Sequence, residues 1–280
     1  MKKISRRSFL AAAGLSVAAL ALTACGGSSA STASSVASSA AASSEAASTS
    51  AAAGELTTVE AGKLTMATNA AFPPYEMTTD AGEFEGIDIE TAQAIADKLG
   101  LELQIDDMDF DAALLSVQQG KADIVMAGVT VTDERKAVMD FSDSYATGIQ
   151  SIVVPEGSDI ASPDDLAGKK IGTQRGTTGY IYCSDDFGDE SVVAYDDGLT
   201  AVQALNNGQV DAVVIDNAPA QEFIAANPGL KILDTSYAEE DYAIGMAKGS
   251  SLEDAVNAAL EELKADGTLQ SIVDKYITAE

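Results

Sequence analysis

A repeated helix–glycine–strand unit limits the possible folds of this chain more than any other feature of its sequence. The stretch FDAALLSVQQGKADIVMAG, residues 110–128, returns 88 positions later as GLTAVQALNNGQVDAVVID, residues 198–216. Each copy has an apolar helical pattern that ends at a glycine, Gly120 or Gly208, followed by an aspartate and a strand-like apolar run. This spacing is too long for a solenoid repeat, so we expect two similar lobes.

Alternation of strands and helices continues on either side of the first copy. The pattern predicts strands at 63–68, 101–105 and 124–127 and helices at 87–99 and 112–119. It is typical of α/β folds with largely parallel sheets. Near the end of the chain, Ser250 and Glu253 have the spacing of a helix capping box.

Gly128 and Asp216 close the two copies of the repeat. Each of them therefore follows a strand of its own lobe. Open α/β sheets bind ligands beyond the carboxyl ends of their strands. We expect a ligand site in a closing cleft between the two lobes.

The N-terminal segment has the pattern of an export signal. The basic stretch MKKISRR is followed by small and apolar residues up to position 24, a run too short for a permanent membrane span. The sequence LTAC at 22–25 resembles the lipobox of bacterial lipoproteins, in which the cysteine carries the lipid. We predict a signal peptide over 1–24 and lipidation at Cys25; the alternative is an ordinary signal with a chance cysteine. The run SRRSFL leaves both the general and the twin-arginine export routes open.

Residues 25–58 are rich in serine and alanine. Such a segment cannot bury enough apolar surface to offset the entropy of the chain. We predict a disordered tether between a membrane anchor and the folded part.

Composition excludes several function classes. The net charge of −28 repels phosphate backbones, so nucleic acid is not an expected partner. The absence of histidine excludes Ser-His-Asp and Cys-His nucleophiles and the usual zinc sites. Cys25 and Cys183 do not make a disulfide framework. We predict no catalytic residues, no metal and no cofactor.

Four segments resemble a known family. They are ATNAAFPPYE at 67–76, GIDIE at 86–90, AGVTVTDER at 127–135 and DFSDSY at 140–145. In this order they are similar to the polar amino-acid-binding proteins of ABC importers, family 3 of the bacterial extracellular solute-binding proteins. The glutamine-binding and the histidine/lysine/arginine-binding proteins are members of this family.

The resemblance implies an α/β fold of the periplasmic-binding-protein type II class, a Venus flytrap with two α/β lobes joined by a two-strand hinge. Lobe 1 would comprise residues 59–150 and 246–280, and lobe 2 residues 151–245 with the hinge crossings. These crossings would lie near 150–154 and 241–246.

The resemblance also implies a clamp for a free amino acid. Arg135 would hold the ligand carboxylate in a two-pronged contact, in the first turn of a helix capped by Thr132. The Gly128 carbonyl and the Asp216 carboxylate would accept from the ammonium. The other implied binding residues are Asn69, Phe72, Phe110, Val129, Thr130, Gln174, Thr177 and Thr178.

Alternatives remain for three of these positions. Arg135 could form a surface ion pair with Asp133 or Glu134, and Asp216 could cap a helix. Relatives that bind cationic ligands carry an acid where this chain has Asn69, so we expect a neutral or small polar amino acid. Glu76 could supply the acid instead.

These features together predict a lipid-anchored binding protein on the extracytoplasmic face of the cell membrane. We expect a monomer that captures a polar amino acid and delivers it to the permease subunits of an ABC importer. Two other functions stay open: an enzyme of the dehydratase type on the same fold, and a surface adhesin or sensor subunit.

Overall fold

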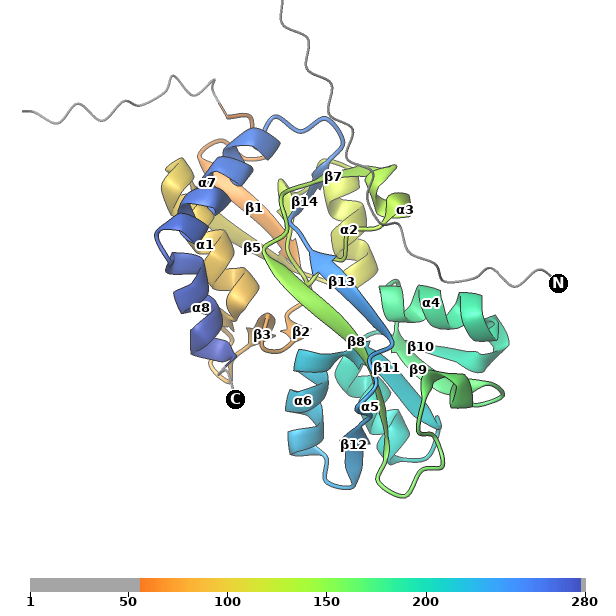
Figure 1. Ribbon diagram of the computed structural model, residues 1–280. Helices are drawn as coiled ribbons and strands as arrows, with labels where there is room; N and C mark the ends of the chain where they lie inside the picture. Colours follow the sequence, from red (N-terminus) through yellow and green to blue (C-terminus); the bar gives the residue numbers. More distant parts are fainter. Residues whose placement is uncertain (1–55, 278–280) are drawn as a thin grey trace, which may run out of the picture. The chain divides into compact units, whose positions relative to one another are not determined.

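The computed structural model describes residues 56–277 (Figure 1). The predicted signal peptide, Cys25 and nearly all of the predicted tether lie outside the described residues. Over the part of the chain that is described, no helix is both long enough and apolar enough to cross a membrane.

The first of two main sheets has the strand order β5-β1-β6-β14-β7. β1 is parallel to β5 and β6, whereas β14 is antiparallel to β6 and β7. Its strands are β1 (Lys63–Thr68), β5 (Glu102–Asp107), β6 (Ile124–Val125), β7 (Met139–Phe141) and β14 (Gly245–Ala247). A small antiparallel sheet lies beside it, formed by β2 (Ala71–Phe72), β3 (Glu76–Thr78) and β4 (Phe84–Glu85).

Helices cover both faces of the first sheet. Leu64 and Met66 of β1 belong to a hydrophobic cluster with side chains of α1 (Ile87–Leu99), α7 (Glu253–Ala265) and α8 (Thr268–Tyr276). Ala67 and Val125 belong to a second cluster, with side chains of α2 (Phe110–Gln118). This division follows from the strand geometry, because successive side chains point to opposite faces of a sheet.

The second main sheet has the order β10-β9-β11-β8-β12, and β13 also pairs with β8. Its strands are β8 (Ala146–Pro155), β9 (Ile171–Gln174), β10 (Val192–Tyr195), β11 (Ala212–Asp216), β12 (Leu230–Ile232) and β13 (Ala238–Tyr242). The helices packed with it are α4 (Thr178–Phe187), α5 (Gly198–Asn206) and α6 (Asn217–Ala226). Two short 3-10 turns, η1 (Pro163–Leu166) and η2 (Asp189–Ser191), complete this half.

The chain passes between the two main sheets twice, at residues 142–145 and 243–244. Both passages adjoin an antiparallel ribbon in which β8 pairs with β13, from Ala146 opposite Tyr242 to Gln150 opposite Ala238 (Figure 1). The first passage precedes the expected region 150–154, whose residues already pair with β11 and β12 in the second sheet. The lobe boundaries at 59–150, 151–245 and 246–280 stay a prediction.

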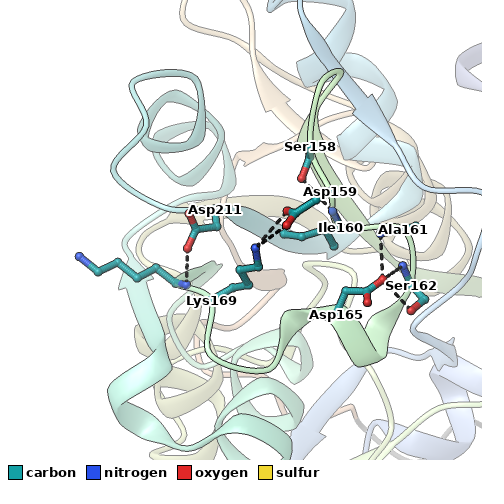
Figure 2. Close-up of polar contacts among 9 residues, drawn as sticks. Ser158, Asp159, Ile160, Ala161, Ser162, Asp165, Lys169 and Asp211 are labelled. Carbon is teal, nitrogen blue, oxygen red and sulfur yellow. Dashed lines mark hydrogen bonds and ion pairs between the residues drawn. The ribbon is translucent and has the colours of Figure 1, made fainter.

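The sequence repeat corresponds to a repeated local structure. Gly120 and Gly208 both have positive φ, 65° and 68°, a conformation that glycine adopts without steric cost. The carboxylate of Asp123 accepts from the Thr65 backbone N–H at 2.8 Å. Asp211, labelled in Figure 2, accepts in the same way from the Lys170 N–H at 2.8 Å. In each half, the aspartate that precedes one strand, β6 or β11, is thus hydrogen-bonded to the backbone in or beside the parallel strand next to it, β1 or β9.

Four local predictions differ from the structure. The strand predicted at 101–105 comprises Glu102–Asp107. The helix predicted at 112–119 begins earlier, at Phe110, and the strand predicted at 124–127 contains only Ile124–Val125. The capping box is wrong: Ser250 Oγ accepts from the Leu252 N–H at 3.2 Å, and α7 begins at Glu253 without a side-chain cap. The Ser250 hydroxyl is used in the turn that precedes the helix.

The two repeated aspartates differ in burial, which gives a stability prediction. Asp123 is buried and also accepts from the Val59 N–H at 2.7 Å, whereas the hydrogen bond that the Asp211 carboxylate accepts from the Lys170 N–H is exposed. Asp123→Ala should lower the free energy of unfolding by about 1–3 kcal/mol, because a buried N–H loses its acceptor. Asp211→Ala, the matched control, should lower it by less than about 1 kcal/mol, because water replaces the carboxylate. Urea unfolding measures both, and equal losses would contradict the prediction.

Candidate functional site

A cavity lined from both halves brings together all predicted binding residues except Val129. It contains about 320 Å³ of empty space, part of it open to solvent. One group of lining residues comes from the elements around the first sheet: Asn69, Phe72, Glu76, Phe110, Ala127, Gly128, Thr130 and Arg135. The other comes from the second half: Gln174, Thr177, Thr178 and Asp216. Val129 is fully buried in the hydrophobic core instead, and its carbonyl accepts from the Ala243 N–H at 3.1 Å.

Arg135 is positioned by a short helix, α3 (Asp133–Lys136). Thr132 caps this helix, as predicted, and its hydroxyl accepts from the Arg135 N–H at 3.2 Å. The Arg135 side chain is buried at 8% exposure. Its guanidinium donates to the carbonyls of Thr130 at 2.8 Å and Gly176 at 3.2 Å.

The partners of the Arg135 guanidinium are neutral, and no carboxylate of residues 56–277 lies within ion-pair distance of it. The alternative of a surface ion pair with Asp133 or Glu134 is therefore wrong. Burial lowers the pKa of the guanidinium from its ordinary value. A guanidinium has five N–H donors in a planar fork, so Arg135 retains donors for an anion in the cavity.

Asp216 is the last residue of β11 and immediately precedes α6. Its carboxylate does not cap that helix. It accepts instead from the Gln150 amide at 2.7 Å and from the Tyr242 hydroxyl, both of which belong to the ribbon. Burial is the main reason that the pKa of Asp216 is raised to about 7. A cation that reached this carboxylate would favour its ionised form.

Gly128 has a steric reason to be glycine. Its φ is +55°, and a Cβ at this position would lie 2.8 Å from the Phe72 ring. The Gly128 N–H donates to Asp88 at 3.0 Å. The carbonyl is therefore the polar group that Gly128 has left to offer a ligand.

Direct hydrogen bonds join the two halves across the cavity. Gln174 donates its amide to the Asn69 side-chain oxygen at 2.8 Å, and Arg135 donates to Gly176. Asn69 in turn donates to the Met108 carbonyl at 2.9 Å. The Asn69 amide therefore already has partners in both halves, the Met108 carbonyl and the Gln174 amide.

Of the aromatic residues, Phe72 and Phe110 line the cavity, and the Phe110 ring centroid lies 5.4 Å from Arg135 Cζ. Tyr75 is not among the residues that line this cavity. It stacks behind Phe72, with ring centroids 5.8 Å apart, and packs edge-on against Tyr242.

Glu240 is a central residue that sequence reasoning missed. Its Oε2 accepts from Thr130 at 3.1 Å, Gln150 at 3.0 Å and Thr178 at 2.9 Å. These donors come from the first half, the ribbon and the second half, so Glu240 links all three. Period-2 alternation in the stretch AEEDY places Glu240 on the same strand face as Tyr242, and this signal could have identified it.

Two buried carboxyls, Glu76 and Asp88, lie next to the clamp. Glu76 lines the cavity and is fully buried. Burial is the main cause that raises the pKa of Glu76 well above its ordinary value and that of Asp88 to about 6. Asp88 has donors of its own, Gly128 and the Tyr145 hydroxyl at 2.8 Å. Among residues 56–277, no group of three His, Cys, Asp or Glu side chains is arranged to hold a metal ion.

These buried acids predict how stability depends on pH. In the unfolded chain their pKa values are about 4, whereas burial raises those of Asp216 and Asp88 in the folded protein. Between these values the folded protein binds more protons than the unfolded chain, so its stability should fall as the pH rises from about 4.5 to about 7.5. Thermal unfolding over this range should show a falling Tm.

The variant Asp216→Asn should flatten this fall, because it removes one raised carboxyl. Asp185→Asn, a change of an exposed aspartate, is the control and should leave the slope unchanged. A Tm of the wild type that rises with pH over the same range would contradict the prediction.

The chain is similar to known proteins over most of its described length. The family model of the bacterial extracellular solute-binding proteins, family 3, matches residues 64–279. The L-cystine-binding protein TcyJ of Escherichia coli (strain K12) is 33% identical over 226 residues, which are 79% of this chain and 85% of that relative.

Solved structures agree with this match. The arginine-, lysine-, histidine-binding protein ArtJ of Geobacillus stearothermophilus is 34% identical with a TM-score of 0.75, covering 78% of this chain and 96% of ArtJ. An ancestral arginine-binding protein bound to glutamine is 42% identical with a TM-score of 0.74, covering 78% and 99% of the two chains. The predicted type II periplasmic-binding-protein fold and the resemblance to amino-acid-binding proteins of ABC importers are confirmed. The chain belongs to the bacterial extracellular solute-binding proteins, family 3.

Proposed function

We propose that this protein captures a polar amino acid in the cavity between its two halves and delivers it to an ABC importer. One observation carries the proposal: buried groups of opposite charge, Arg135 and Asp216, line the same cavity from different halves. An α-amino acid carries its carboxylate and its ammonium on the same carbon atom, and each needs a partner when it leaves water. Relatives described as binding cystine, histidine, arginine and glutamine support this class of ligand.

The contacts of the clamp suggest how a ligand is held. The free donors of Arg135 take the ligand carboxylate. Thr130 also lines the cavity, and its hydroxyl donates to Glu240. Asp216 and the Gly128 carbonyl accept from the ligand ammonium. Gln174, Thr177 and Thr178 cover the ligand from the second half, and Phe72 and Phe110 contact its side chain. Asn69 and Gln174 keep the cavity closed through their mutual hydrogen bond.

We further propose a binding protein without catalytic activity. The described residues around the clamp give each charged group of an amino acid a static partner. Prolonged incubation with the bound amino acid, followed by mass spectrometry, should return it unchanged. The appearance of a dehydrated or otherwise altered product would favour the enzyme alternative.

We also propose that the protein is a monomer held at the extracytoplasmic face of the cell membrane by a lipid on Cys25. The LTAC sequence supports this, since two or more acyl chains anchor a protein stably. The remainder of the tether would let the binding unit reach the permease subunits.

A screen of amino acids by thermal shift tests the proposed function. A ligand that binds only the folded state raises its stability, by about 2.7 kcal/mol at a hundredfold excess over Kd. We expect at least one polar amino acid to raise the Tm clearly. A complete set of amino acids without any shift would overturn the proposal.

Substitutions in the clamp should weaken binding of the amino acid so identified. Arg135→Ala and Asp216→Ala should each lose about 2–5 kcal/mol of binding free energy, because a buried charge of the ligand loses its partner. This is about 30-fold to several-thousand-fold in Kd by calorimetry. Arg135→Lys should also weaken binding, since lysine keeps the charge but not the two-pronged geometry.

Arg175 offers a matched control in the loop that touches Arg135. Its side chain is half exposed and forms an ion pair with Asp196 at 3.3 Å. Arg175→Ala should leave Kd within about threefold, less than 1 kcal/mol. If Arg135→Ala and Asp216→Ala also stay within threefold, the clamp is misassigned.

Removal of the proposed lipid site should release the protein. In a bacterial host, Cys25→Ser should move the protein out of the membrane fraction and remove the mass of the acyl chains. Ser28→Ala, a change close by in the proposed tether, is the control and should leave it in the membrane. An unlipidated wild type that remains membrane-bound would contradict the proposed anchor.

A further inference from the structure

Glu76 is the buried acid that the amino-acid clamp does not use. It begins β3, is fully buried and lines the cavity. Neither of its carboxylate oxygens has a hydrogen-bond donor, and within residues 56–277 no other buried carboxyl shares this property. Asp88 and Glu240, by comparison, each have one oxygen with two or three donors. A buried acid of this kind needs either a proton or a cation.

The described residues around Glu76 supply no cation to its carboxyl. The ionisable groups that act on it most strongly are carboxyls: Asp88, Asp216 and Asp107. The hydroxyls of Tyr75, Tyr145 and Tyr242 also lie close enough to be influenced by these acids. Arg135 is the basic residue among those that line the cavity, and it faces the two carbonyls already described. Without a ligand, Glu76 therefore keeps a proton, which it can share with the Asp88 carboxyl.

A bound amino acid would leave one ionisable group of the cavity without a partner. The lining residues contribute one base, Arg135, and two acids, Asp216 and Glu76. The carboxylate and ammonium of a free amino acid pair with Arg135 and Asp216. Glu76 remains, and a third, positive group on the ligand would match it.

Phe72 gives this position a second feature that suits such a ligand. It pairs with Glu76 across the β2–β3 ladder, and residues directly opposite each other in a ladder lie on the same face. An apolar ring thus lies next to the acid, both lining the cavity. Ligand side chains with a methylene stem and a charged end combine the same two properties.

We propose that Glu76 exchanges its proton for the positively charged side-chain group of the ligand, so that the preferred ligands are amino acids with cationic side chains. This inference rests on the proposed function and narrows its ligand class. The presence of Asn69 led us to expect a neutral ligand, with Glu76 as an alternative acid for a cationic one. The structure favours this alternative. The Asn69 amide already bonds Met108 and Gln174, so it is committed to joining the two halves.

Calorimetry with L-arginine, L-lysine and L-glutamine tests the proposal on the wild-type protein. Arginine or lysine should bind at least tenfold more tightly than glutamine. Titrations near pH 7 in buffers of different ionisation enthalpy should show that arginine releases up to about one proton more than glutamine. Asp216 meets the ammonium of every ligand, so its own titration cancels in this difference. Because arginine binding releases more protons, the affinity for arginine should rise with pH more steeply than that for glutamine.

Substitution of Glu76 isolates its contribution. Glu76→Gln should weaken arginine binding by about 30-fold or more, because the ligand cation loses its buried partner. It should change glutamine binding by less than about threefold and abolish the difference in proton release. Glu85→Gln changes an exposed acid of the same small sheet and should alter none of these values. Circular dichroism establishes that each variant is folded.

Two results would overturn the proposed ligand class. Glutamine binding tighter than that of arginine and lysine would overturn it while leaving the proposed function intact. Equal proton release for arginine and glutamine would also overturn it, and this result needs only the wild-type protein. If no amino acid binds at all, the proposed function fails, and the ligand class fails with it.

Discussion

Antiparallel pairing between β8 and β13 is the constraint on which the site depends, because this ribbon connects the two halves and carries the groups that hold the clamp. Gln150 of β8 and Tyr242 of β13 both donate to Asp216. Glu240, also on β13, accepts from Thr130 and Thr178 of the opposite halves. A change in the twist of the ribbon would therefore move the acceptor for the ligand ammonium and the walls of the cavity together.

Burial of charge is the second theme of the structure. Arg135, Asp216 and Glu76 leave water without an ion-pair partner among the described residues, which is unfavourable unless a ligand supplies the opposite charges. In the folded protein, two backbone carbonyls accept hydrogen bonds from Arg135, and the pKa values of Glu76 and Asp216 are raised. These features lower the stability of the empty protein and make the binding of a charged ligand more favourable.

Local patterns in the sequence predicted several of the helices and strands, whereas the residues of the clamp came from the family resemblance. The repeated Gly and Asp predicted two related halves, and their matching contacts to Thr65 and Lys170 give the physical reason for the repeat. The family resemblance predicted ten residues that line the cavity, but it also included Val129, whose side chain belongs to the core. The capping box failed because Ser250 Oγ bonds within its own turn, a choice that spacing alone cannot reveal.

The sequence by itself determined which residues can form helices and strands, that Gly120 and Gly208 end helical segments, and which residue types could hold an amino acid. These properties depend on neighbours a few positions away. Only the tertiary structure decided that Glu76 has no donor, that Glu240 joins both halves and that Asn69 is bonded to Gln174. Such properties depend on burial and on partners that are up to 110 positions distant, as for Glu240 and Thr130, and chain folding alone brings these together.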